Sequence, residues 1–203
     1  WLADVTGTPR MVGVFGFGDT LRPGAQEAIR RLQAQGIRTA LVSGDNHGSV
    51  AAVGRLLGIT ELHHGVLPED KAARVAAFKT GGRRVAMVGD GINDAPALAA
   101  ADVGIALGSG TDVAMQAAGI TLMQADPQRV ADAIDISRRT WTKIRQNLFW
   151  AFIYNLVGLP LAALGGLNPV IAGAAMAFSS VSVVTNALLL RRWKPAPAAG
   201  AAR

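Results

Sequence analysis

Residues 89–96 read Gly-Asp-Gly-Ile-Asn-Asp-Ala-Pro, and this octapeptide decides the fold of the chain. It follows an apolar run at 84–88 that is typical of a buried strand. Asp90 and Asp94, with Asn93 between them, suit a phosphate and Mg²⁺ site, because Mg²⁺ takes hard oxygen ligands and usually one or two protein carboxylates. The glycines beside Asp90 let the backbone turn sharply where open parallel sheets place ligands. The alternative is an ordinary turn that leads into a helix capped by Asp94.

Residues 11 to about 125 alternate apolar, strand-like runs with helical patterns. We expect strands at 11–17, 38–43, 84–88, 103–107 and 120–123, and helices at 23–35, 50–57 and 68–79, after Pro96 and after Thr111. Such alternation favours a parallel sheet covered by helices on both faces. His63 and His64 fall between these elements, where a solvated turn is a simpler interpretation than a metal site.

A long helix is predicted from Pro127, a residue well suited to a first helical turn. No charged residue and no His occurs between Arg145 and Arg191, a length that fits two spanning helices with a break at 165–169. Basic residues flank both outer ends, so we expect a membrane hairpin with both ends cytoplasmic. A buried helical pair in a soluble domain is the alternative, although each helix would then need a polar face.

These patterns divide the chain into four parts. Residues 1–126 form an α/β domain, 127–146 a cytoplasmic linker helix, 147–190 two transmembrane helices, and 191–203 a cytoplasmic tail that we expect to be disordered. The start at Trp1, without Met, predicts a piece of a longer protein.

The formal charge of +6 does not indicate a nucleic-acid partner. Eight basic residues flank the long apolar region, and taking them from the 20 Lys and Arg leaves 12, against 14 acidic residues. The basic excess therefore follows membrane topology. The chain has no Cys, which excludes disulfides and thiolate metal ligands.

The octapeptide and residues 97–114 resemble the hinge motif and phosphorylation domain of P-type ATPases, and more narrowly their heavy-metal branch. The resemblance extends from about Gly13 to about Lys194. It implies a haloacid-dehalogenase-like domain with a Rossmann-type parallel sheet, followed by a two-helix transmembrane hairpin. It also implies ATP and Mg²⁺ as cofactors, with Asp90 and Asp94 as the magnesium ligands and Asn93 in the same motif.

Further residues match that family's phosphate-handling motifs. Ser43-Gly44-Asp45 matches a motif that usually begins with Thr, and Lys71 matches the lysine that neutralises the transferred phosphoryl group. Asp19 and Arg22 match the Asp-x-x-Arg segment at the hinge to the nucleotide domain. Taken alone, the first motif is a common turn, Lys71 a solvated surface charge, and Arg22 part of a helix entry.

The family's phosphorylated Asp lies in an Asp-Lys-Thr-Gly-Thr string that does not occur in these 203 residues. In the family this string precedes the nucleotide domain, so it would lie upstream of Trp1. We therefore expect no ATP hydrolysis by this chain alone. The resemblance implies the rest of a pump as partner: upstream transmembrane helices, an actuator domain and a nucleotide domain.

Polar residues inside the apolar region indicate a site for a transported metal ion, the cargo of a pump. Tyr154 and Asn155 fall in the first helix, and Met176 and Ser180 lie one turn apart in the second. They resemble the Tyr-Asn and Met-x-x-Ser-Ser motifs of copper pumps, and a thioether suits Cu⁺. Helices without charge favour a monovalent soft ion, Cu⁺ or Ag⁺, over Zn²⁺. Apolar filling by Met176 and small-residue packing by Ser180 are the alternatives.

The sequence thus predicts part of a Cu⁺-exporting P-type ATPase of the plasma membrane, with a copper chaperone as a candidate partner. Three alternatives stay open. One is a membrane-anchored phosphatase of the same fold, for which Asp4 and Asp19 are the available nucleophiles. Another is a non-catalytic subunit of a split pump. The third is a pump for another cation such as K⁺.

Overall fold

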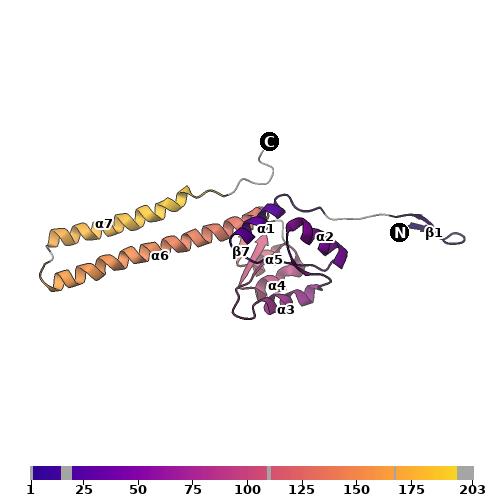
Figure 1. Ribbon diagram of the computed structural model, residues 1–203, viewed down its shortest axis with the longest axis horizontal. Coiled ribbons are helices and arrows are strands. Elements are labelled where there is room, and N and C mark those ends of the chain that lie inside the picture. The colour runs from indigo at the N-terminus through magenta and orange to yellow at the C-terminus, as the bar shows by residue number, and fades with distance from the viewer. Residues whose placement is uncertain (1, 15–19, 109–110, 167, 196–203) are drawn as a thin grey trace.

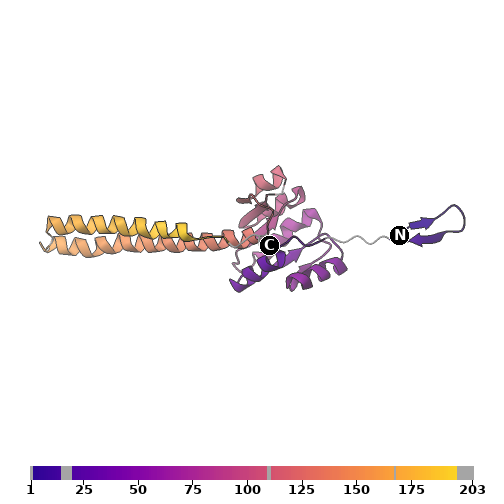
Figure 2. The ribbon, with the colours of Figure 1, turned by 90° about the horizontal axis from the view of Figure 1, so that it is seen from above.

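The computed structural model describes residues 2–14, 20–108, 111–166 and 168–195. It has three parts: a two-stranded ribbon near the N-terminus, an α/β body, and a long helical hairpin (Figure 1). The ribbon and the hairpin extend from the body in opposite directions in both views (Figures 1 and 2).

The ribbon consists of β1 (Leu2–Asp4) and β2 (Arg10–Gly13), which pair antiparallel. This corrects the prediction of a parallel-sheet strand at 11–17: its first residues pair with β1, and residues 15–17 lie outside the described part. Period-two apolar residues specify a strand without specifying its partner, which here is a nearby segment reached by a short turn.

The body confirms the predicted α/β class. Its strands form two parallel sheets, β3 (Ala40–Val42) with β4 (Glu61–His63), and β5 (Ala86–Gly89) with β6 (Val103–Leu107) and β7 (Ile120–Leu122). The helices between them are α1 (Ala25–Ala34), α2 (His47–Leu57), α3 (Pro68–Phe78), α4 (Ala95–Ala100) and α5 (Asp112–Ala117). The parallel pairing places the carboxyl ends of the strands of each sheet at one edge, where the polar motifs lie.

Two local predictions need correction. The solvated turn expected at His63 is wrong, because His63 ends strand β4 and packs edge-on against Phe78, with 5.3 Å between ring centroids. Helix α2 begins three residues before the predicted Val50, because the Asn46 side chain accepts a hydrogen bond from the Ser49 amide at 3.0 Å and caps it there.

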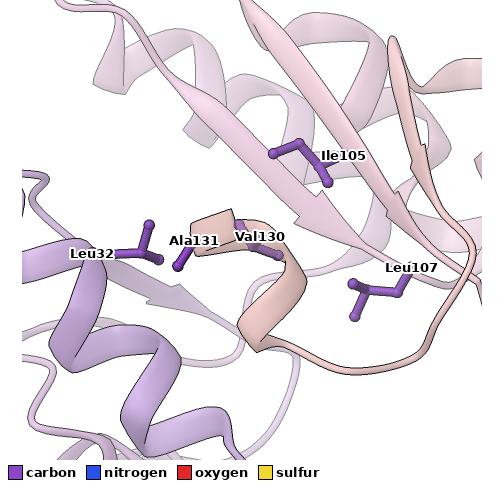
Figure 3. Packing of buried hydrophobic residues seen from close by; sticks show 5 residues of the cluster. All are labelled: Leu32, Ile105, Leu107, Val130 and Ala131. Atoms are coloured by element: carbon purple, nitrogen blue, oxygen red, sulfur yellow. The ribbon is translucent and has the colours of Figure 1, made fainter. Parts of the chain in front are cut away.

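A hydrophobic cluster joins the body to the hairpin. It contains Leu32 of α1, Ile105 and Leu107 of β6, and Val130 and Ala131 of helix α6 (Gln128–Ala163), all buried (Figure 3). The first turns of α6 therefore belong to the body's core, and the rest of the helix leaves it as one continuous rod (Figure 1).

Gly104 of β6 lies against the backbone of α4. A Cβ at this position would be 2.6 Å from the Leu98 carbonyl oxygen, which cannot move aside without disturbing the helix. We expect Gly104→Ala to lower the free energy of unfolding by about 2 kcal/mol. Urea unfolding in detergent, followed by circular dichroism, measures this. Gly119→Ala is the matched control, because its Cβ would make only an ordinary contact at 3.9 Å. Equal stability of the two variants would contradict the prediction.

The hairpin pairs α6 with α7 (Pro169–Leu188), which continues as the 3₁₀ helix η2 (Leu189–Arg192) (Figures 1 and 2). Among the described helices, one segment, Ala172–Arg192, is long and apolar enough to cross a membrane. Two such segments are predicted above. The uncharged stretch of α6, at 146–163, rises about 27 Å, slightly less than the hydrocarbon thickness of about 30 Å, and it includes the polar side chains of Gln146, Asn147 and Asn155.

Polar contacts tie the open end of the hairpin together. The Trp193 indole donates to Asp135 Oδ2 at 2.7 Å, and Arg139 Nε donates to the same oxygen at 2.9 Å. Farther along the hairpin, Lys143 donates to Asn186 Oδ1 at 2.6 Å, and Asn186 donates to Asn147 Oδ1 at 2.8 Å. These bonds hold the end of α7 against α6 beside the body.

The Trp193 hydrogen bond, with help from Arg139, holds the pKa of Asp135 below its usual value of 3.8, against the opposing effect of burial. Because the folded pKa is the lower one, this stabilisation is present above about pH 4 and is lost as the pH falls through the folded pKa. We expect Asp135→Asn to weaken the Trp193 anchor by about 1 kcal/mol at pH 7, and by less at pH 2, because the carboxyl group loses charge as the pH falls. Amide exchange of residues 189–193 measures this. Asp70→Asn, at an exposed position, is the control. The same loss at both pH values would contradict the prediction.

Candidate functional site

The octapeptide forms a tight turn at the carboxyl end of β5. A 3₁₀ turn, Ile92–Asp94, precedes α4, and the Asp94 amide donates to the Gly91 carbonyl at 3.0 Å. Asp94 folds back so closely that a Cβ on Gly89 would lie 2.7 Å from the Asp94 Cβ. Only glycine fits at position 89. Asn93 lies in the same turn and is exposed.

Each carboxylate of this turn is paired with a cation from a distant segment. Lys71 Nζ of α3 lies 2.8 Å from Asp94 Oδ1, and the two side chains are only 18% and 15% exposed. Arg22 forms an ion pair with Asp90, and both of these side chains are 40% exposed. Arg22 Nη1 also donates to the Ala125 carbonyl at 3.4 Å. The structure thus brings together four of the residues singled out in the sequence, and Lys71 is part-buried rather than solvated.

Ser43, Gly44 and Asp45 form a second polar turn at the carboxyl end of β3. Ser43 Oγ donates to Asp45 Oδ2 at 2.7 Å, and the Val66 amide donates to the Ser43 carbonyl at 3.0 Å. Within the residues that the structure describes, no hydrogen bond or ion pair links this turn to Asp90 or Asp94. The reason lies in the strands, since β3 and β5 belong to different sheets. Asp19 lies outside the described residues.

The four candidate cargo residues lie in the hairpin. Asn155 donates to the Ala151 carbonyl at 3.0 Å, and Ser180 Oγ donates to the Met176 carbonyl at 3.2 Å, so both polar groups are bonded within their own helices. Met176 is 73% exposed. Because Asn147 bonds Asn186 across antiparallel helices of equal rise, Tyr154 and Asn155 lie at about the same level along the hairpin as residues 176–180.

Sequence reasoning missed two features of this site. Arg22 was expected at a hinge, and no local pattern reveals its contact with Asp90, 68 residues away. The Thr111 amide donates to the Asp90 carbonyl at 3.0 Å and ties the start of α5 to the octapeptide. A backbone contact of this kind leaves no side-chain signature in a sequence.

The chemistry of the turn fits Mg²⁺. Two carboxylates supply hard oxygens on one short segment, and Gly89 lets Asp94 fold back against the end of β5. Arg22 and Lys71 pair with these carboxylates, so the four side chains together carry no net formal charge. Asp90 is more exposed than Asp94 and therefore the more accessible carboxylate.

Residues 3–102 match the family described as haloacid dehalogenase-like hydrolase. A protein of Mycobacterium tuberculosis named "Probable copper-exporting P-type ATPase V" is 54% identical over 91% of this chain and 24% of its own length. A copper-exporting P-type ATPase of Staphylococcus aureus is 51% identical over 92% of this chain and 23% of its own length. The solved structure of a zinc-transporting PIB-type ATPase, in its E2.Pi state, has a TM-score of 0.79 at 40% identity and covers 86% of this chain and 29% of that one.

This chain belongs to the P-type ATPase family. Within it, the body is the haloacid-dehalogenase-like domain, and α6 and α7 follow in the part matched by the solved pump. This P-type ATPase chain spans about a quarter of the length of the two bacterial relatives.

Proposed function

We propose that this chain is the part of a Cu⁺-exporting P-type ATPase that stabilises the transferred phosphoryl group and carries one membrane hairpin. The observation that carries the proposal is the cluster of Lys71, Asp94, Asp90 and Arg22 at the end of β5. Within the pump, the body would lie in the cytoplasm of a plasma-membrane protein. Its partners would be lipid, the remaining domains of the pump and a copper chaperone.

In the proposed reaction, the terminal phosphoryl group of ATP passes to the carboxylate of an Asp outside these 203 residues, and ADP leaves. Asp94 holds the ammonium group of Lys71 in place. In this position the positive charge of Lys71 offsets the negative charge on the phosphoryl oxygens. The Ser43 hydroxyl and the backbone amides of its turn would hold further phosphoryl oxygens. When bound by Asp90 and Asp94, Mg²⁺ supplies charge neutralisation for this transfer.

The sheets support a nucleophile that comes from another segment. Among the described strands, β3 pairs with β4 alone, and β5 pairs with β6 alone, so each keeps one open edge. Open edges invite pairing with a further strand. A strand that follows the same parallel order would bring its own carboxyl end beside Asp90 and Ser43.

Two observations support copper as the cargo. The relatives of 51% and 54% identity are named copper-exporting, whereas the zinc-transporting pump is 40% identical. The hairpin between Arg145 and Arg191 also lacks a carboxylate that would favour a divalent ion. Cu⁺ and Ag⁺ share the soft chemistry of the thioether, so the proposal covers both.

Metal-dependent phosphorylation tests this function. The intact pump that contains this chain is incubated with labelled ATP and Cu⁺, Ag⁺ or Zn²⁺, and the acid-stable phosphoenzyme is counted. We expect Cu⁺ and Ag⁺ to stimulate phosphorylation and Zn²⁺ to have no effect. Stimulation by Zn²⁺ alone would contradict Cu⁺ as the transported ion but would still support the proposed phosphoryl transfer. A phosphoenzyme that forms equally without metal would overturn the pump itself.

The membrane-anchored phosphatase is less well supported. Asp4 accepts two hydrogen bonds from Thr6, at 2.9 and 2.6 Å, and lies in the ribbon, away from the body (Figure 1). We expect the purified chain not to hydrolyse p-nitrophenyl phosphate. Mg²⁺-dependent hydrolysis that Asp19→Asn abolishes would revive this alternative.

A further inference from the structure

The two carboxylates proposed to bind Mg²⁺ differ in how firmly each holds its cation. The Lys71–Asp94 pair is part-buried, whereas the Arg22–Asp90 pair is 40% exposed at both side chains. An exposed ion pair is worth little, typically about 0 to 1 kcal/mol, because water screens it. Arg22 is therefore the partner that can leave at low cost.

We propose that Arg22 competes with Mg²⁺ for Asp90, so that Arg22 leaves this carboxylate when the metal binds. The inference rests on the proposed function, because it takes Asp90 as a magnesium ligand. Arg22 is then a positioning residue: it screens Asp90 in the metal-free protein and is released in the metal-bound one.

The coordination chemistry supports this competition. Mg²⁺ requires oxygen ligands at about 2.0–2.1 Å in a nearly octahedral shell. A guanidinium bound to Asp90 Oδ2 places a positive charge beside the carboxylate that would meet the metal, and like charges repel. Lys71 can stay on Asp94 Oδ1, since the other oxygen, Oδ2, accepts only a long hydrogen bond of 3.4 Å from the Gly91 amide and can still meet the metal.

The position of Arg22 gives its release a consequence. The Arg22 carbonyl accepts a hydrogen bond from the Ala25 amide at the start of α1, at 3.1 Å. Its guanidinium also reaches the Ala125 carbonyl, three residues before α6 begins. The Arg22 side chain thus touches Asp90 and the segment that leads to the hairpin, and its backbone holds the entry to α1. Mg²⁺ binding at Asp90 would therefore loosen the link from this carboxylate to the entry to α1 and to the segment that leads to the hairpin.

Mg²⁺ affinity of the purified 203-residue chain, measured by calorimetry in detergent, tests the inference. Under competition, we expect Arg22→Ala to bind Mg²⁺ roughly fivefold more tightly than the wild type. Arg22→Lys should fall between the two, because it keeps the charge but loses the fork geometry. Arg30→Ala is the matched control, since Arg30 pairs with Glu27 on the outer face of α1. It should bind as the wild type does.

A second measurement tests the competition between Arg22 and Mg²⁺ even if the variants fold poorly. Amide exchange of residues 20–25 and 125–131 in the wild type should speed up when Mg²⁺ is added. Unchanged exchange, or Arg22→Ala that binds Mg²⁺ equally or more weakly, would overturn the competition. A wild type that binds no Mg²⁺, or binds it equally well as Asp90→Asn, would instead overturn the magnesium site of the proposed function.

Discussion

In the intact pump, Lys71→Met is expected to slow phosphoenzyme formation about 1,000-fold, since removing one preorganised charge from a transition state costs about 10² to 10³ in rate. The substitution keeps the length of the side chain and removes its charge. Asp94 would then keep a part-buried carboxylate without its cation 2.8 Å away, so the turn itself would lose order. Rapid-quench measurement with labelled ATP gives the rate directly.

Lys79→Met separates this effect from a general loss of charge. Lys79 ends the same helix, and its ammonium group lies 3.4 Å from Asp102, away from the octapeptide turn. We expect this variant to keep the wild-type rate within about twofold, as for most surface pairs. Equal losses in the two variants would mean that Lys71 supports only the fold of the domain.

The sequence predicts the parts of this site that are local in the chain. Asp90, Asn93 and Asp94 lie within one octapeptide, whose glycines and carboxylates restrict both backbone and chemistry. The helix that carries Lys71 begins at Pro68, as its Pro-Glu-Asp start predicts. Long segments such as α6 and α7 are equally clear in the sequence, because a helix that is buried in a core or faces lipid needs many apolar residues at regular positions.

Contacts between distant segments are what the sequence leaves undetermined. The Arg22–Asp90 pair joins residues 68 apart, and its geometry depends on how α1 packs against β6 and α6. Strand β4, unlike the equally short β3 and β7, has only one apolar residue, Leu62, so no apolar run marks it in the sequence. The sharing of α6 between the core and the hairpin also depends on packing, since Val130 and Ala131 are buried by residues far away in the chain.

Met176→Leu has the second largest expected effect, now on the metal rather than on the phosphoryl group. Leucine keeps the apolar volume and removes the thioether, the soft ligand that the proposed function assigns to the hairpin. We expect the Cu⁺ concentration for half-maximal phosphorylation by ATP to rise about 100-fold, by analogy with the effect of groups that support a metal site. Phosphorylation by inorganic phosphate, which needs no metal in the membrane, should stay at the wild-type level.

This pair of readouts separates a ligand from a packing residue. If Met176 only filled space in the bilayer, leucine would replace it without effect, and both reactions would remain unchanged. If it held the hairpin together, both reactions would fall. Val184→Ala, at another exposed position of α7, is the control for a packing defect. Only a loss confined to the copper-dependent reaction supports direct contact between Met176 and the metal, because the phosphorylation site and the fold would then both be intact.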